Sequence, residues 1–198
     1  MAKYRGSRGK IARKFGEPLL GCAKVLQKRT TPPGEHGAKR KKQSPYGIQL
    51  FDKQKAKIRY GYAEKPFRNL VKSVISQKGA SREKLMQSLE LGISNIVYRL
   101  GIAPTVPAAR QLIVHRHITV NGNCLDRPFY ILQKGDRIAL SKKAQQFEFI
   151  KNSLANRTSY PWLVWDEKTQ QGSVIDRPAL KTIPERINVS SIIEFYAR

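Results

Sequence analysis

Apolar residues recur at helical spacing through the middle of the chain. The five that follow Pro66 occupy positions i, i+3, i+4, i+7 and i+8, and they are Phe67, Leu70, Val71, Val74 and Ile75. This stripe predicts a helix with one buried face, and Pro66 suits its first turn. A weaker helical pattern covers residues 46–60, where much of the surface is cationic. Ser81 can cap a further helix that continues to Gly92.

Residues 93–141 combine two short helical patterns with a strand pattern. The first helix carries one apolar face and ends at Gly101, and Thr105 is a good cap for the second. Residues 118–120 are strand-like, and Asn121-Gly122 is a strong signal for a tight turn. Two more strands are predicted at residues 130–132 and 137–140. We therefore expect two helices packed on a small antiparallel sheet.

The two ends of the chain have different patterns from the middle. The first 45 residues are rich in Gly, Pro, Lys and Arg with few apolar anchors, so we expect a partly extended arm. The tail predicts a helix near residues 144–155, short extended pieces, and an amphipathic helix at 190–198. The predicted fold class is α+β. The predicted divisions are a basic arm at 1–45, a helical domain at 46–90, an inserted module at 91–155, and a C-terminal segment at 156–198 that returns to the helical domain.

The net charge of the chain indicates what class of partner it binds. The chain of 198 residues has 38 Lys and Arg against 14 Asp and Glu, a net charge of +24. Its first sixty residues include only three acidic side chains, Glu17, Glu35 and Asp52. Such an excess of like charge opposes compaction unless a polyanion neutralises it, and nucleic acid and anionic membranes are the common polyanions. Because no run of about 18 apolar residues occurs, we expect no transmembrane helix.

The side chains that could support catalysis or bind metal are sparse. The sequence has no nucleophile elbow, no P-loop and no cluster of metal ligands, so we predict no enzyme activity and no cofactor. His115 and His117 could share a metal but lack a third ligand nearby in the sequence. Cys22 and Cys124 are expected to be free thiols, which suits the cytosol or the interior of an organelle. Trp162 and Trp165 could stack on bases, although packing in a core or an interface is the favoured interpretation.

Several motifs resemble a known RNA-binding module. The motifs within the module are Asn95–Gly101 (NIVYRLG), Ala109–Leu112 (ARQL), His117–Gly122 (HITVNG) and Lys134-x-Asp136. This module is shared by ribosomal protein S4 of the small subunit, some pseudouridine synthases and a bacterial tyrosyl-tRNA synthetase. The flanking segments are similar to bacterial-type ribosomal protein S4 in particular, and they are Pro32–Gly37 (PPGEHG), Tyr46–Lys55 and Ile193–Arg198 (IEFYAR).

The resemblance implies both a fold and a function. It implies a helical domain built from both ends of the chain with the RNA-binding module inserted between them. It also implies direct, early binding to rRNA of the small subunit, organisation of the subunit body, and support of decoding accuracy. The implied partners are ribosomal protein S5 and messenger RNA, which lies nearby where it enters the small subunit. The resemblance fits a cytoplasmic or an organellar ribosome. Two alternatives stay open at this point, an RNA-modifying enzyme and a free-standing RNA-binding regulator of transcription or translation.

The chain departs from the family pattern at three places. Residues 104–107 (PTVP) stand where family members usually carry basic residues. Arg116 replaces the glycine that is frequent between the two histidines, which costs roughly 1 kcal/mol if the position requires a positive φ. Only Cys22 lies in the region where some members bind zinc with a cysteine cluster, so we predict no zinc site.

The candidate RNA-binding residues are mostly cations, because Arg can contact phosphates in a bidentate manner and Lys attracts them as a point charge. Any single one of them could instead be a solvated surface side chain. In the arm they are Lys3, Arg5, Arg8, Lys10, Arg13 and Lys14. In the linker and first predicted helix they are Lys39, Arg40, Lys41, Lys42, Tyr46, Gln49, Lys53, Lys55 and Arg59. In the module they are Arg99, Arg110, Gln111, His115, Arg116, His117 and Asn121.

Overall fold

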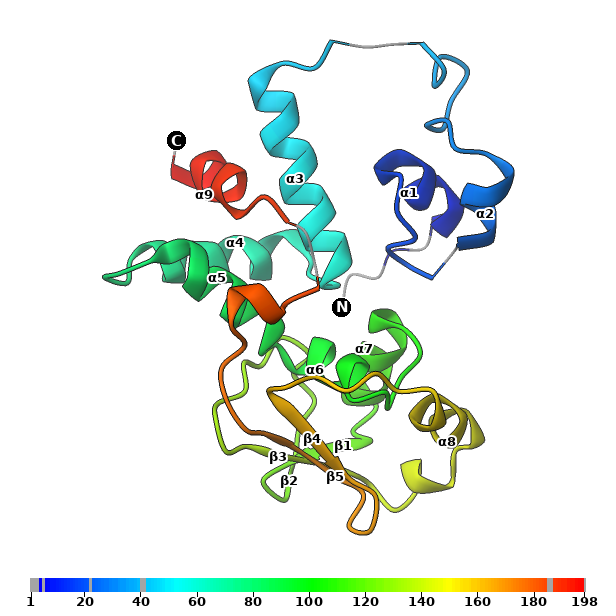
Figure 1. The fold of residues 1–198 in the computed structure, drawn as a ribbon, viewed down its shortest axis with the longest axis vertical. Coiled ribbons are helices and arrows are strands. Elements are labelled where there is room, and N and C mark those ends of the chain that lie inside the picture. Colours follow the sequence, from blue (N-terminus) through cyan, green and yellow to red (C-terminus); the bar gives the residue numbers. More distant parts are fainter. Residues whose placement is uncertain (1–3, 5, 22, 40–41, 185–186, 198) are drawn as a thin grey trace. The chain divides into compact units, whose positions relative to one another are not determined.

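The computed structural model describes residues 4, 6–21, 23–39, 42–184 and 187–197 (Figure 1). The contacts divide the chain into two compact units. The first comprises residues 1–68 and 187–198, and the second comprises residues 69–186. The second unit is therefore an insertion between two parts of the first.

The first unit is helical. It contains α1 (Arg8–Phe15), α2 (Ala23–Lys28), α3 (Pro45–Arg59), the first residues of α4 (Glu64–Ile75) and α9 (Val189–Ala197). The Ser44 side chain caps α3 by accepting a hydrogen bond from the Gly47 backbone N–H, and Pro45 occupies the first turn. α9 packs against α3, with Ile192 fully buried (Figure 1). The α+β class is confirmed and the C-terminal helix returns to a helical unit, but residues 69–90, which we had assigned to the helical domain, belong to the second unit.

The arm contains more regular structure than the sequence indicated. We expected a partly extended arm with few apolar anchors, and within it α1 and α2 form and pack against each other. Ala12, Phe15 and Leu19 are buried, and the Phe15 ring centroid lies 4.8 Å from that of Phe51 in α3. The Arg13 guanidinium donates hydrogen bonds to the carbonyls of Thr31 and Pro32. A few apolar anchors and one arginine thus order a segment that is rich in Gly and Lys.

The helices of the second unit match the apolar patterns with small shifts. They are the remainder of α4, α5 (Ser81–Glu90), α6 (Ile93–Arg99), α7 (Val106–Val114) and α8 (Glu148–Ala155). Thr105 caps α7 as predicted, by accepting from the Ala108 backbone N–H. Ser81 is the first residue of α5 rather than its cap, because Ala80 occupies the cap position. α4 begins two residues before Pro66.

A five-stranded antiparallel sheet supports the helices of this unit in the order β2-β1-β3-β5-β4. The strands are β1 (Ile118–Val120), β2 (Asn123–Cys124), β3 (Arg137–Leu140), β4 (Leu163–Asp166) and β5 (Gln171–Val174). Val120 pairs with Asn123 across the predicted Asn121-Gly122 turn, and Thr119 pairs with Ala139 of β3. The predicted strand at residues 130–132 is wrong, because Ile131 forms only an isolated bridge with Gly92.

The sheet extends beyond the predicted limits of the inserted module. Arg137 of β3 pairs with Ser173 of β5, and β5 pairs in turn with β4. Residues 163–174 therefore belong to the sheet of the second unit, although we had assigned residues 156–198 to a segment that returns to the helical domain. The return itself occurs later, at α9.

The core of the second unit lies between the sheet and the two helices α6 and α7. It includes Ile96 and Val97 of α6, Ile113 of α7, and Ile118 and Ile138 of the sheet. Trp162 is also fully buried here, which confirms that it packs rather than stacks on a base. A short 3-10 helix, η1 (Ala144–Gln146), precedes α8, and a second, η2 (Leu180–Thr182), follows β5. Within the described ranges, no helix is both long and apolar enough to cross a membrane.

Candidate RNA-binding site

Several cations of the arm are exposed. Arg8, Lys10 and Lys14 project from α1, whereas Arg13 is half-buried and fixes the backbone near Thr31. Lys39 and Lys42 are exposed in the linker to α3. Lys3, Arg5, Arg40 and Lys41 lie outside the described residues.

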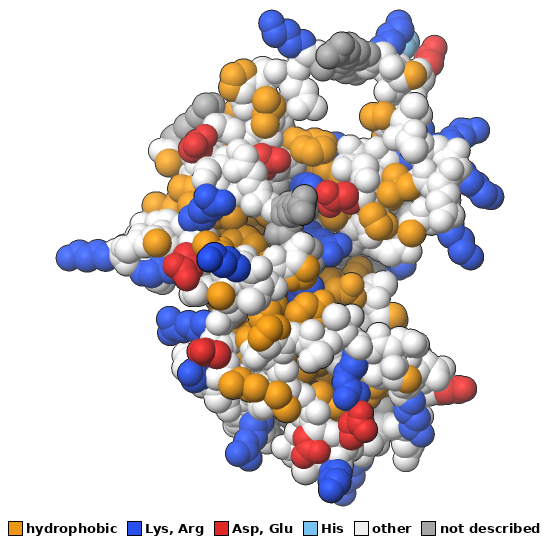
Figure 2. Space-filling view, in the orientation of Figure 1, with side chains coloured by type: hydrophobic (Ala, Val, Ile, Leu, Met, Phe, Trp, Pro, Cys, Tyr) orange, Lys and Arg blue, Asp and Glu red, His pale blue; other side chains and the backbone are white. Residues whose placement is uncertain are grey.

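The short helix α2 adds cations that the candidate set omits. Lys24 and Lys28 lie one helical turn apart, and both are exposed together with Arg29. The i, i+4 spacing of the two lysines could have indicated that they share one face, but this spacing places side chains together only if the segment is helical. On the face shown in Figure 2, Lys and Arg side chains project as separate groups rather than as one continuous patch.

Much of the candidate set on α3 has a structural role. Lys53 is only 6% exposed, its Nζ lies 2.7 Å from Oε1 of Glu64, and it lies over the Phe195 ring of α9 at 4.5 Å. Gln49 is also buried and donates to the Glu194 carboxylate at 2.9 Å. Lys53 and Gln49 are therefore withdrawn as RNA-binding candidates, because their polar atoms join α3 to α4 and α9.

The remaining candidates on α3 differ in accessibility. Lys55 pairs with Glu17 at 2.6 Å, and Arg59 is half-buried. Tyr46 is exposed at the start of α3, and its ring lies 5.5 Å from that of Phe195. Of these residues, Tyr46 is the one most open to a ligand.

Glu64 is the acidic centre of the α3–α9 contact. Lys53 and Lys57 both donate to its carboxylate, and the Tyr196 hydroxyl donates to Oε1 at 3.1 Å. Burial alone would raise the pKa of Glu64, but hydrogen bonds from the two lysines and their charges outweigh it and lower the pKa to about 2. Burial also raises the pKa of Tyr196, reinforced by the neighbouring carboxylate. Ionised Glu64 therefore stabilises the first unit.

Replacing Glu64 with glutamine is expected to destabilise the protein near pH 7 by about 1 kcal/mol. The carboxylate is 48% exposed, so solvent screening keeps the effect well below the full linkage value. Because the folded-state pKa lies below the usual value of 4.5, the ionised carboxylate contributes its full stabilising free energy above about pH 4.5. Its contribution falls as the pH drops through about 2. Thermal melts from pH 6 to pH 2 should show the wild type and Glu64→Gln converging.

The matched control for this acid titration is Glu83→Gln on α5. The Glu83 carboxylate is exposed and accepts a hydrogen bond from neutral Gln87 at 3.2 Å. Its replacement should change the melting temperature little at any pH. A constant difference between the wild type and Glu64→Gln across the whole range would contradict the role assigned to the ion pairs.

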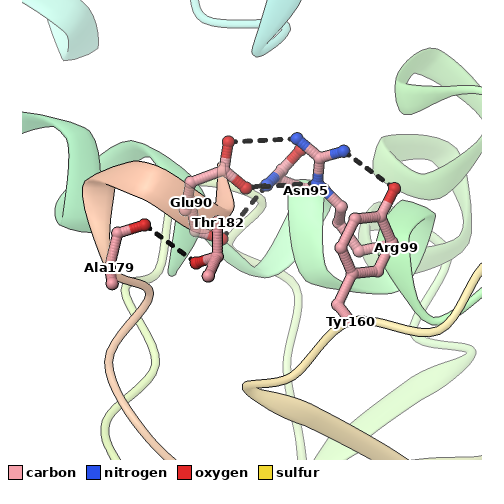
Figure 3. Close-up of polar contacts among 6 residues, drawn as sticks. All are labelled: Glu90, Asn95, Arg99, Tyr160, Ala179 and Thr182. Carbon is pink, nitrogen blue, oxygen red and sulfur yellow. Dashed lines mark hydrogen bonds and ion pairs between the residues drawn. The ribbon is translucent and has the colours of Figure 1, made fainter. Parts of the chain in front are cut away.

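Arg99 of α6 is buried, and its side chain belongs to a polar network rather than to a surface open to RNA (Figure 3). The side chain of Glu90 is fully buried, and its two oxygens accept from Nη2 and Nε of Arg99 at 3.1 Å each. Asn95 donates to the same carboxylate at 2.8 Å, and Arg99 Nη1 donates to the Tyr160 hydroxyl at 3.0 Å. The network connects α5, α6 and the segment before β4. Arg99 is therefore withdrawn as an RNA-binding candidate.

The other module candidates lie along the end of α7 and the start of β1. Gln111, His115 and Arg116 are exposed, and His117 is half-buried. Arg110 is half-buried, with its guanidinium 5.0 Å from the centre of the Phe129 ring, and burial lowers its pKa. These five candidates lie within one segment, and each is at least partly accessible.

Two of the candidates have unusual backbone conformations. Arg116 has a φ of 60°. The position therefore requires the positive φ that would make arginine, in place of the glycine frequent in the family, cost roughly 1 kcal/mol. Its side chain is 70% exposed and pairs with Asp126 at 3.2 Å. Asn121 has a φ of 51° in the turn, and its side chain bonds to Asp136 and to the Arg137 backbone N–H. Asn121 thus shapes the turn, which limits the atoms that it can offer to RNA.

The described part of the chain has no group of three or more His, Cys, Asp or Glu residues that could hold a metal ion. His115 and His117 lie close together, with ring centroids 6.2 Å apart, and Cys124 is a free, exposed thiol. Cys22 lies outside the described residues. The accessible chemistry is therefore that of cations, amides and aromatic rings, which suits contact with phosphates and bases.

Comparison with known proteins identifies the family. Residues 3–90 match the family model "Ribosomal protein S4/S9 N-terminal domain", and residues 91–138 match the model "S4 domain". The chain is 48% identical to small ribosomal subunit protein uS4 of Parabacteroides distasonis and of Bacteroides fragilis, over 100% of both proteins in each comparison. It is 46% identical to the uS4 protein of Amoebophilus asiaticus, again over 100% of both. The chain belongs to the uS4 family.

The two uS4 family models divide the chain differently from its contacts. The N-terminal model ends at Glu90, the buried partner of Arg99, and the S4 domain model ends inside β3 at Ile138. β4, β5 and α8 follow the end of the second model, yet β5 pairs directly with β3. The full-length matches to uS4 proteins cover this remaining region as well.

Proposed function

We propose that this chain is a structural protein of the small ribosomal subunit that binds its rRNA directly and has no enzymatic activity. The observation that carries this proposal is the end-to-end similarity to small ribosomal subunit protein uS4 at 48% identity. The exposed cations of α1, α2 and the α7–β1 segment support it, because they give both units a means of contacting phosphates.

The finer parts of the proposal rest on the family resemblance. The chain binds 16S-type rRNA as a primary assembly protein, organises the body of the subunit and supports decoding accuracy. Ribosomal protein S5 is a neighbouring partner, and messenger RNA passes nearby. The chain works in cytoplasmic ribosomes, and an organellar ribosome would use the same chemistry.

The RNA contacts divide between the two units. In the first unit we assign them to the exposed cations and one aromatic residue, which are Arg8, Lys10, Lys14, Lys24, Lys28, Arg29, Lys39, Lys42 and Tyr46. In the second unit we assign them to Arg110, Gln111, His115, Arg116 and His117. The mechanism is positioning by phosphate contacts with recognition of RNA shape, because the deep, narrow major groove of RNA helices admits few side chains.

Sedimentation of cell extracts at moderate salt tests the proposal. A tagged copy of the chain should migrate with small subunits and remain with them after a wash that removes loosely bound proteins. A free-standing regulator of transcription or translation would instead stay mainly near the top of the gradient. Purified chain should also bind small-subunit rRNA without chemically altering it, and modified nucleosides in the recovered RNA would contradict the non-enzymatic assignment.

A further inference from the structure

Four aromatic rings form a continuous row in the second unit, where the end of α7 approaches the start of α8. The ring centroids of His115 and His117 are 6.2 Å apart, those of His117 and Phe147 are 5.2 Å apart, and those of Phe147 and Phe149 are 5.6 Å apart. His117 meets Phe147 edge to face at 85°, whereas Phe147 and Phe149 are stacked at 21°. The row therefore joins two histidines of the candidate RNA-binding site to two phenylalanines that are far away in the sequence.

The inner part of the row is held by the fold. Phe147 packs against the core of the second unit and occupies the cap position of α8. The backbone N–H of Ser141 donates to the carbonyl of His117 at 2.9 Å, which joins the histidine segment to the end of β3. The Phe147 ring and the backbone of His117 thus have fixed supports. The ends of the row are open, since His115 is exposed and Phe149 is 45% exposed.

A single exposed phenylalanine is ordinary in a folded protein and needs no explanation. Phe149 differs because one of its faces is stacked on an anchored ring while much of the side chain remains open to solvent. The segment that carries it is also basic. Lys142, Lys143 and Lys151 are all exposed, and Glu148 is the one acidic residue between positions 141 and 151. An open aromatic face with several exposed cations close to it in the sequence suits a ligand that combines a flat ring with a phosphate.

We propose that an unpaired RNA base stacks on the open face of Phe149 and extends the row, while Lys142 and Lys143 contact the neighbouring phosphates. This inference rests on the proposed rRNA-binding function and adds a base-stacking platform outside the predicted site. Stacking on an aromatic side chain tolerates any base, because every base has a π face. Proteins use it on unpaired nucleotides, whose faces are accessible.

The test uses the full chain and a short single-stranded RNA carrying 2-aminopurine, whose fluorescence falls on stacking. The wild type should quench the probe. Phe149→Leu, which removes the ring but keeps apolar volume, should abolish the quenching and weaken binding about tenfold, or about 1.4 kcal/mol. The slope of binding against salt should not change, because no phosphate contact is lost. Phe149→Tyr should restore both quenching and affinity.

Tyr130→Leu is the matched control, since it removes another aromatic side chain that is 42% exposed in the same unit. Equal losses in Tyr130→Leu and Phe149→Leu would overturn the proposal, as would a wild type that does not quench the probe. Binding of the wild type, Phe149→Leu and Tyr130→Leu to small-subunit rRNA distinguishes failure of the proposed function from failure of the stacking platform. Failure of the wild type to bind that rRNA refutes the proposed function. Equal binding by the wild type and Phe149→Leu, with thermal melts showing both folded, refutes only the stacking platform.

Discussion

Replacing Arg99 with methionine is expected to destabilise the protein by about 3–5 kcal/mol, because the fully buried carboxylate of Glu90 would lose its charged partner. For a chain of this size, that loss corresponds to a fall in melting temperature of roughly 10 °C. The Tyr160 hydroxyl would lose a hydrogen bond as well. Thermal unfolding followed by circular dichroism measures the effect directly.

Two further variants establish the cause. The double variant Glu90→Leu with Arg99→Met should be less destabilised than Arg99→Met alone, because both charges are removed and no unpaired charge stays buried. Arg116→Gln is the contrasting control, since this exposed side chain forms only a surface ion pair. It should weaken rRNA binding and change stability by less than about 1 kcal/mol. An Arg99→Met protein that melts like the wild type but binds rRNA poorly would return Arg99 to the RNA-binding set.

Neutralising the exposed lysines of the first unit should produce the largest change in RNA affinity. The variant replaces six lysines by glutamine, and they are Lys10, Lys14, Lys24, Lys28, Lys39 and Lys42. If all six contact phosphates, the slope of log affinity against log salt becomes shallower by about four to five, and affinity at 0.1 M salt falls on the order of 10⁴-fold. Titrations of small-subunit rRNA at several salt concentrations measure both quantities.

Substitution is preferable here to deletion of the arm. Phe15 and Leu19 are buried, and Glu17 pairs with Lys55, so a deletion would confuse lost packing with lost charge. The matched control carries six exposed cations of the second unit changed to glutamine, and they are Lys72, Lys78, Arg82, Lys168, Arg177 and Lys181. It should shift the slope much less. Equal slopes for the two variants would mean that net charge alone governs binding.

Local patterns predicted the parts of the fold that depend on neighbours in the sequence. The apolar spacing after Pro66, the Thr105 cap and the Asn121-Gly122 turn each involve residues within a few positions of one another, and each has a counterpart in the structure. β4 and β5 were missed as part of the sheet because their connection to β3 depends on a partner more than thirty residues earlier. Such pairing leaves no signal in local periodicity.

The candidate site shows the same limit at the level of single side chains. Arg99 and Lys53 look like surface cations in sequence, and only the fold brings Glu90 and Glu64 against them. The converse error concerns α2, whose exposed lysines were passed over because six residues with few apolar anchors give a weak helical signal. Accessibility, which decides whether a cation can contact RNA, is a property of tertiary contacts. The individual RNA contacts therefore stay predictions.

The position of α9 has a consequence for synthesis of the chain. Its partner α3 is made first, then the whole of residues 69–186, and only afterwards the helix that covers α3. The second unit is continuous in sequence and can fold as soon as it has emerged, whereas the first must wait for residues 189–197. A chain released before residues 189–197 are made would therefore have a finished second unit but an uncovered α3, and Gln49 would lack its partner Glu194. Residues 189–197 thus decide whether the first unit is completed.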